Sequence, residues 1–183
     1  MPLSLVTAAT AEPLTVDEFK THQRIDTPDE DSLISAYLTA ARSWVETATH
    51  RQLVTATWRL TMNGFYDDRY FNSKRNAIDI PIPPLSSITS ITYLDSGGTS
   101  TVWATSNYAV DTYHEPGRIT LTYGASWPST RLIANDVTIL FVAGYGAAST
   151  VPEGLKQAIR FLAAHWYENR EPMNIGNIVS AIP

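Results

Sequence analysis

The chain has 183 residues, a formal net charge of −5 and 44% hydrophobic residues, which is enough apolar material for one folded domain. Charged residues make up only 17% of the sequence and aromatic residues 10%, so the bulk of the chain is not intrinsically disordered. The 13 Lys and Arg residues are outnumbered by 18 Asp and Glu residues, which argues against a broad basic face for nucleic acid. The absence of Cys excludes disulfides, thiolate metal sites and a cysteine nucleophile.

The N-terminal part predicts an extended arm followed by two helices. No Lys or Arg precedes the short apolar stretch at the N-terminus, so we interpret it as an arm and not as a signal peptide. A first helix is expected from Thr15, because Thr15 and Glu18 form a capping box. A second helix is expected over about residues 29–49, where apolar residues recur every three or four positions. The residues of this apolar stripe are Leu33, Ile34, Tyr37, Ala41, Trp44, Val45 and Ala48.

From residue 53 onward the sequence period changes to two, which predicts strands. Apolar and polar residues alternate over 57–62 and 118–123, and 88–94 is rich in β-branched residues. The segment 137–142 is apolar on both faces, so we expect it to be the most buried strand. Tight turns between the strands favour an antiparallel sheet or a small barrel over βαβ units.

A third helix is expected over about residues 150–170. Thr150 and Glu153 predict a second capping box, with Pro152 at the first helical position. Residues 171–183 carry apolar side chains with no helical period, which is unusual for a solvated tail. These apolar residues are Ile175, Ile178, Val179 and Ile182.

The predicted fold is α+β, with three main helices packed against a central antiparallel sheet or small barrel and an extended arm at each end. Two of the helices are N-terminal and one is C-terminal. We interpret the chain as a single domain, 1–183. Its parts are the N-terminal arm (1–14), the helical pair (15–50), the β region (51–149), the C-terminal helix (150–170) and the C-terminal arm (171–183).

No catalytic, cofactor-binding or metal-binding pattern is present. None of the four His residues lies four positions from another, and no Ser has the surroundings of a hydrolase nucleophile. We therefore predict a protein that is not an enzyme. A small hydrolase using Asp67 or Asp68 stays open as an alternative, because paired carboxylates can share acid and base roles.

The loop 63–77, inside the β region, interleaves aromatic and cationic residues. This composition is typical of protein interfaces and of single-strand stacking sites. We predict that this loop contacts another protein. Two alternatives are a β-hairpin whose aromatic side chains simply cover the sheet, and a contact with nucleic acid. The candidate interface residues are Phe65, Tyr66, Arg69, Tyr70 and Phe71.

The order of several short segments resembles that in the head–tail connector family of tailed bacteriophages, also called head-completion or adaptor proteins. The resemblance extends over about residues 14–171 and leaves the loop 63–77 and the C-terminal arm without a secure match. The segments are LTVDEFKTHQRID (14–26), DEDSLI (29–34), AAR (40–42), THR (49–51), TWRL (57–60), IPPLSSI (82–88), FVAGYG (141–146), VP (151–152) and AHWYENRE (164–171).

The resemblance implies a structural role in the virion neck, at the head–tail interface, after assembly in the host cytoplasm. Family members form a ring, typically a dodecamer, beneath the portal protein and provide a platform for a stopper or tail protein. The implied partners are further copies of the chain, the portal protein and a stopper or tail protein, with no membrane. DNA would pass through the lumen without sequence-specific binding, because a negative ring lets DNA slide.

The C-terminal arm fits an assembly step, since an apolar segment can become ordered when it docks. We expect Ile175, Ile178, Val179 and Ile182 to insert into the portal protein or a neighbouring subunit. Another neck role, as stopper or tail terminator, remains an alternative. A carbohydrate-binding β module, suggested by five Trp and nine Tyr residues, is a further one.

Overall fold

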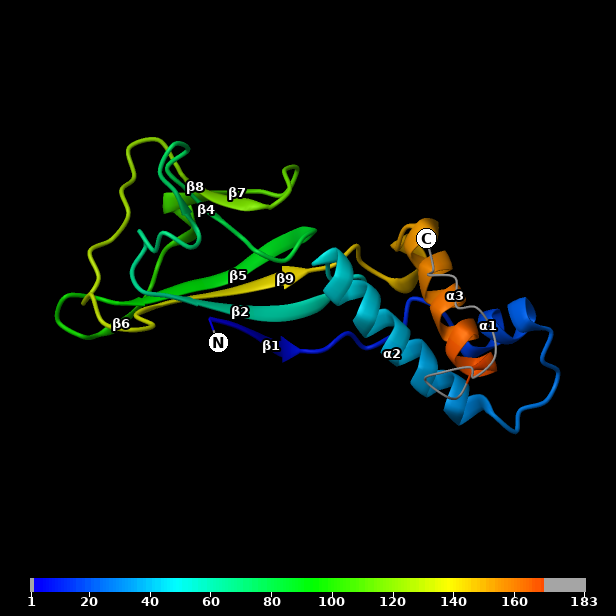
Figure 1. Cartoon of the computed structure of the whole chain (residues 1–183). Helices are drawn as coiled ribbons and strands as arrows, with labels where there is room; N and C mark the ends of the chain where they lie inside the picture. Colours follow the sequence, from blue (N-terminus) through cyan, green and yellow to red (C-terminus); the bar gives the residue numbers. More distant parts are fainter. Residues whose placement is uncertain (1, 170–183) are drawn as a thin grey trace, which may run out of the picture. The chain divides into compact units, whose positions relative to one another are not determined.

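The computed structural model describes residues 2–169, which divide into two units (Figure 1). Residues 2–11 and 49–151 form one unit, which we call the sheet unit. Residues 12–48 and 152–169 form the other, which we call the helical unit. The fold class is α+β, as predicted from the sequence.

Three helices make up the helical unit: α1 (Val16–Gln23), α2 (Asp31–Thr49) and α3 (Glu153–Glu168). The capping box of α1 forms as expected, because the Thr15 hydroxyl oxygen accepts the Glu18 N–H at 3.1 Å and the Thr15 N–H donates to the Glu18 carboxylate at 2.8 Å. The helices enclose a small apolar core. Its buried residues are Phe19, Ile34, Leu38, Ala41, Val45, Ile159 and Ala163.

Side chains from different helices also meet within this unit. The Phe19 ring packs edge-on against Tyr167, with centroids 6.1 Å apart. The Tyr167 hydroxyl donates to Glu30, and Lys20 pairs with Asp31 at 2.9 Å. The buried residues of α2 are Ile34, Leu38, Ala41 and Val45, which lie on one side of the helix, as expected for its period.

Three details of the helical prediction were wrong. Ala48, which the predicted apolar stripe included, is exposed near the C-terminal end of α2. Trp44 is 58% exposed, because the core takes its neighbour Val45 and the two side chains point about 100° apart around the helix. Thr150 does not cap α3, which begins at Glu153 after Pro152 and has no side-chain cap. The Thr150 hydroxyl instead donates to the carbonyl oxygens of Tyr145 and Ala147.

The strands of the sheet unit form two open antiparallel sheets, and the part of the chain described contains no closed barrel. The five-stranded sheet has the spatial order β1 (Leu3–Thr7), β2 (Ala56–Met62), β9 (Val137–Ala143), β5 (Leu85–Leu94) and β6 (Ser100–Val102). The four-stranded sheet has the order β3 (Phe71–Asn72), β4 (Ala77–Asp79), β8 (Arg118–Leu121) and β7 (Tyr108–Asp111). Two short 3₁₀ turns, η1 (Thr105–Asn107) and η2 (Ala148–Thr150), complete the elements.

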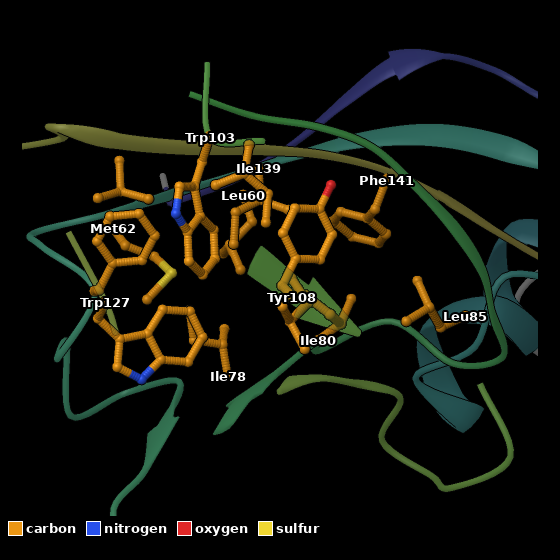
Figure 2. Packing of buried hydrophobic residues seen from close by; sticks show 14 of the residues in the cluster. Leu60, Met62, Ile78, Ile80, Leu85, Trp103, Tyr108, Trp127, Ile139 and Phe141 are labelled. Carbon is orange, nitrogen blue, oxygen red and sulfur yellow. The ribbon is translucent and has the colours of Figure 1, made fainter. Parts of the chain in front are cut away.

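The N-terminal arm is partly a strand, since β1 pairs with β2 at the edge of the five-stranded sheet. β9 occupies the centre of that sheet, where buried and half-buried residues alternate along its length. One apolar core joins the two sheets (Figure 2). Leu60, Ile139 and Phe141 come to it from the five-stranded sheet, and Ile78 and Ile119 come from the four-stranded sheet.

Candidate interaction site

The loop 63–77 is built around a buried carboxylate. Asp67 accepts hydrogen bonds from the backbone N–H groups of Asn63 (2.9 Å) and Arg69 (3.2 Å) and from the Arg69 guanidinium. Its own carbonyl oxygen accepts from the N–H groups of Tyr70 and Phe71. The Arg69 guanidinium and the backbone N–H groups of Asn63 and Arg69 lower the pKa of Asp67 to about 2. Asp67 is thus the ionised centre of a loop fold, which leaves it no proton to exchange at neutral pH.

The five predicted interface residues separate into a buried one and a group near the surface. Phe65 is 1% exposed, and its ring stacks on Trp127 at 5.4 Å and lies 5.3 Å from Trp103. Phe65 is therefore a core residue, packed in the cluster that contains Trp103 and Trp127. Tyr66, the next residue, is 64% exposed.

The other four predicted residues form two contacting pairs in the loop. Tyr66 and Phe71 meet edge-on, with ring centroids 4.8 Å apart. Arg69 lies over the Tyr70 ring at 5.5 Å, a distance suited to a cation–π contact. Tyr70 and Phe71 are half-buried and Arg69 is exposed. The structure thus places Tyr66 against Phe71 and Arg69 over Tyr70, two contacts within one loop.

A groove of about 330 Å³ runs beside Tyr66. Sequence reasoning missed its other wall, in which Leu132 is exposed and holds a left-handed backbone (φ 57°). The buried Asp136 carboxylate fixes this wall, because one oxygen accepts the Gly64 N–H at 2.5 Å and the other accepts the Leu132 N–H at 2.9 Å. The adjacent apolar pair Leu132 and Ile133, inside an otherwise polar segment, was the available sequence signal. The groove is lined by Asn63, Gly64, Phe65, Tyr66, Trp127, Pro128, Ser129, Thr130 and Leu132.

A second, more open hollow of about 450 Å³ belongs to the same loop and is lined by residues 68–74 and Asp79. One carboxylate oxygen of Asp79 is buried there, and the other lies 3.4 Å from the Asn72 amide. Polar and charged residues line most of this hollow, together with Tyr70 and Phe71, whereas the groove beside Tyr66 is mainly apolar. The aromatic groove is therefore the better candidate for contact with another protein.

Charge is divided unequally between the two units. Within the described residues, the helical unit carries ten Asp and Glu residues against five Lys and Arg residues. The sheet unit carries seven of each kind and is formally neutral. The whole formal charge of −5 therefore corresponds to the excess of carboxylates in the helical unit.

The predicted docking residues of the C-terminal arm, Ile175, Ile178, Val179 and Ile182, lie outside residues 2–169. Between residues 2 and 169 no three His, Cys, Asp or Glu side chains gather in a way that could hold a metal ion. No helix in the same range is long and apolar enough to cross a membrane.

Comparisons with known proteins point in one direction. A family model described as "Head completion protein" matches residues 12–175. The comparison with curated protein sequences gives no significant match. Among solved structures, the chain is similar to a chain from the neck of an empty gene transfer agent (GTA) particle computed with C6 symmetry. The two share 29% identity at a TM-score of 0.78, over 97% of this chain and 89% of that chain.

Two further structures show the same likeness. One is the virion of a native gene transfer agent particle, with 29% identity, a TM-score of 0.75 and coverage of 100% of this chain and 90% of that chain. The other is the neck of a native GTA particle computed with C12 symmetry, with 29% identity, a TM-score of 0.74 and coverage of 100% and 89%. The likeness therefore includes both units of the fold.

Proposed function

Because the chain belongs to the head completion protein family, we propose that it is a structural adaptor in the neck of a phage-like particle. In this role it forms a ring under the portal protein, completes the DNA-filled head, continues the DNA channel and receives the tail. The observation that carries the proposal is the full-length likeness to chains of GTA necks computed with C6 and C12 symmetry. A cyclic neck is built from repeated copies, and a ring is the closed form of such an arrangement.

The division of charge supports an assignment of the two units in the ring. DNA passing through a channel binds to clustered Lys and Arg and is repelled by carboxylates. The excess of five carboxylates in the helical unit suits the wall of the channel, whereas the neutral sheet unit suits contacts between proteins. We therefore assign the helical unit to the lumen of the ring.

Two segments are proposed to make contacts with other proteins of the neck. The loop surface around Tyr66 and Phe71, with its groove beside Trp127, offers the exposed ring of Tyr66 packed against the half-buried ring of Phe71, an arrangement suited to an interface hot spot. The C-terminal arm contributes Ile175, Ile178, Val179 and Ile182, which we assign to the portal protein or a neighbouring copy. These roles require no catalytic centre, cofactor or metal.

Electron cryo-microscopy of particles from cells that carry the gene, beside particles from a knockout, tests the proposal. We expect density for this chain as a ring between the portal and the tail, and tail-less heads that leak DNA in the knockout. Density for the chain elsewhere in the neck would assign it as a stopper or tail terminator instead. Complete, infectious particles without the protein would overturn the adaptor role.

A further inference from the structure

The edges of the four-stranded sheet are protected against pairing with another chain. β7 ends in Asp111, whose carboxylate binds Arg118 at 3.0 Å and His114 at 2.8 Å. At the other edge, β3 has only two residues and is followed by Lys74 and Arg75. Charged side chains and short length are the usual means by which proteins prevent their sheet edges from pairing with other chains.

The edges of the five-stranded sheet have no such charges. β1 and β6 are its outermost strands, so each is paired on one side only. The segments 2–11 and 96–104, which contain these strands, include no charged residue. Apolar side chains are exposed on both, with Leu5 at 49% and Val102 at 67%. Uncharged edges with exposed aliphatic side chains are the type that pairs with another strand.

The formal charges of the two units also favour the sheet unit as the place where copies meet. Copies in a ring meet side by side, and two helical units would each bring an excess of carboxylates to such a contact. Like charges facing each other across a contact are unfavourable. The formally neutral sheet unit imposes no such repulsion, so contacts between copies through this unit cost less.

We propose that neighbouring copies join edge to edge, with β1 of one copy pairing with β6 of the next; the inference rests on the ring proposed above. A cyclic ring requires two different surfaces on each copy, one for each neighbour. The two opposite edges of a single sheet meet this requirement. The partner at each edge is therefore a second copy of this chain.

The sheet topology also determines the direction of the new pair. Four antiparallel pairings separate β1 from β6, so the two strands run in the same direction within one copy. A small rotation about the ring axis largely preserves strand direction from one copy to the next. The strands that meet between copies are therefore parallel, in contrast to every pairing within the sheet.

The absence of Cys from the chain allows a direct test by cross-linking. Particles are assembled in cells whose only copy of the gene encodes Leu5→Cys together with Val102→Cys, or Val6→Cys together with Val102→Cys. They are then treated with a short bismaleimide, which tolerates a shift of register. We expect a ladder of covalent multimers on a denaturing gel for at least one double variant. Each single variant, which presents one thiol per copy at only one edge, gives no ladder.

The matched control places the second thiol on a protected edge. Leu5→Cys combined with Val110→Cys pairs β1 with β7 of the four-stranded sheet, and no ladder is expected. Circular dichroism of each purified variant checks that these surface replacements leave the fold intact. Complete necks without a ladder in either double variant would overturn the edge pairing and leave the ring in place. Particles whose necks lack this chain even without substitutions would overturn the proposed function itself.

Discussion

The Arg69 guanidinium binds both carboxylate oxygens of Asp67, two residues earlier in the chain. Nε lies 2.8 Å from Oδ1, and Nη2 lies 2.5 Å from Oδ2. A bidentate pair of this kind has a defined geometry as well as favourable energy. Asp67 is buried and also accepts backbone N–H groups, so the pair holds the loop in the shape that exposes Tyr66.

We expect Asp67→Asn to lower the free energy of unfolding by about 1–3 kcal/mol at pH 7, because buried donors lose a charged acceptor. The pKa of Asp67 is about 2 in the folded chain and about 3.9 in an unfolded one. The stabilisation by the carboxylate is therefore complete above the unfolded pKa and is lost as pH falls from there through the folded pKa. Urea denaturation at several pH values measures this, and the variant should show a smaller loss of stability toward acid pH.

The neighbouring Asp68→Asn provides the control for that measurement. Asp68 is exposed, and surface substitutions usually change stability by no more than about 0.5 kcal/mol. Equal effects of the two substitutions would contradict a central role for Asp67 in the loop.

Gly144 is required where β9 ends. Its φ is +123°, and a Cβ there would lie 2.8 Å from the backbone of Val54 and of Thr55. We expect Gly144→Ala to cost about 1–3 kcal/mol from backbone strain, and more from the clash. Gly124→Ala is the control, because Gly124 has φ +80° but open space around its Cβ position. Thermal unfolding compares the two, and equal losses would show that the clash contributes nothing.

The regular elements were predictable from the sequence because a periodic pattern that extends over many residues is not obscured by a few exceptions. α2 was predicted within two residues of its true start, since its acidic first turn and apolar stripe agree. The period did not show that the core takes Leu38 and leaves Trp44 exposed. A stripe that wide spans most of the helix surface, and only the neighbouring helices decide which side is buried.

The candidate site was less predictable because it lies in irregular segments. Phe65 and Tyr66 are adjacent and chemically alike, and no local pattern separates the buried ring from the exposed one. Trp127, which stacks on Phe65, and Asp136, which binds the Gly64 N–H, decide their positions. Both residues come from segments more than 60 positions away in the chain, beyond the range of any local signal.

Substitutions of Phe65 and of Tyr66 should have different effects, because one ring is buried and the other is exposed. Phe65→Ala should cost about 3–5 kcal/mol of stability, the usual loss for a buried Phe. Tyr66→Ser, on an exposed side chain, should leave urea denaturation almost unchanged and reduce ring formation or tail joining instead. Counting tailed particles for each variant measures the second effect. Normal tailing with Tyr66→Ser, and with Phe71→Ser added, would assign the loop surface a purely structural role.

Removal of residues 172–183 tests the C-terminal arm. We expect the truncated chain to keep the circular dichroism spectrum of the full chain but to fail to attach to DNA-filled heads. In the proposed role, the apolar side chains that are lost, including Ile175 and Ile182, would contribute contact energy at the docking surface. Sedimentation of purified heads with added protein measures attachment. Attachment equal to that of the full chain would contradict the role of the arm.

If the helical unit lines the channel, a charge reversal in this unit should affect DNA passage more than the same reversal in the sheet unit. Asp26 in the helical unit and Asp68 in the sheet unit are both exposed, and replacement of either by Lys changes each copy by two charges. Asp26→Lys should slow DNA passage through the ring, because a cation on the wall attracts phosphates, whereas Asp68→Lys should have little effect. The rate of DNA release from purified particles at low and high salt measures both. The slowing should fade as salt rises, because salt screens exposed charges. Equal slowing by the two variants, or slowing that does not depend on the salt concentration, would contradict the assignment of the helical unit to the channel wall.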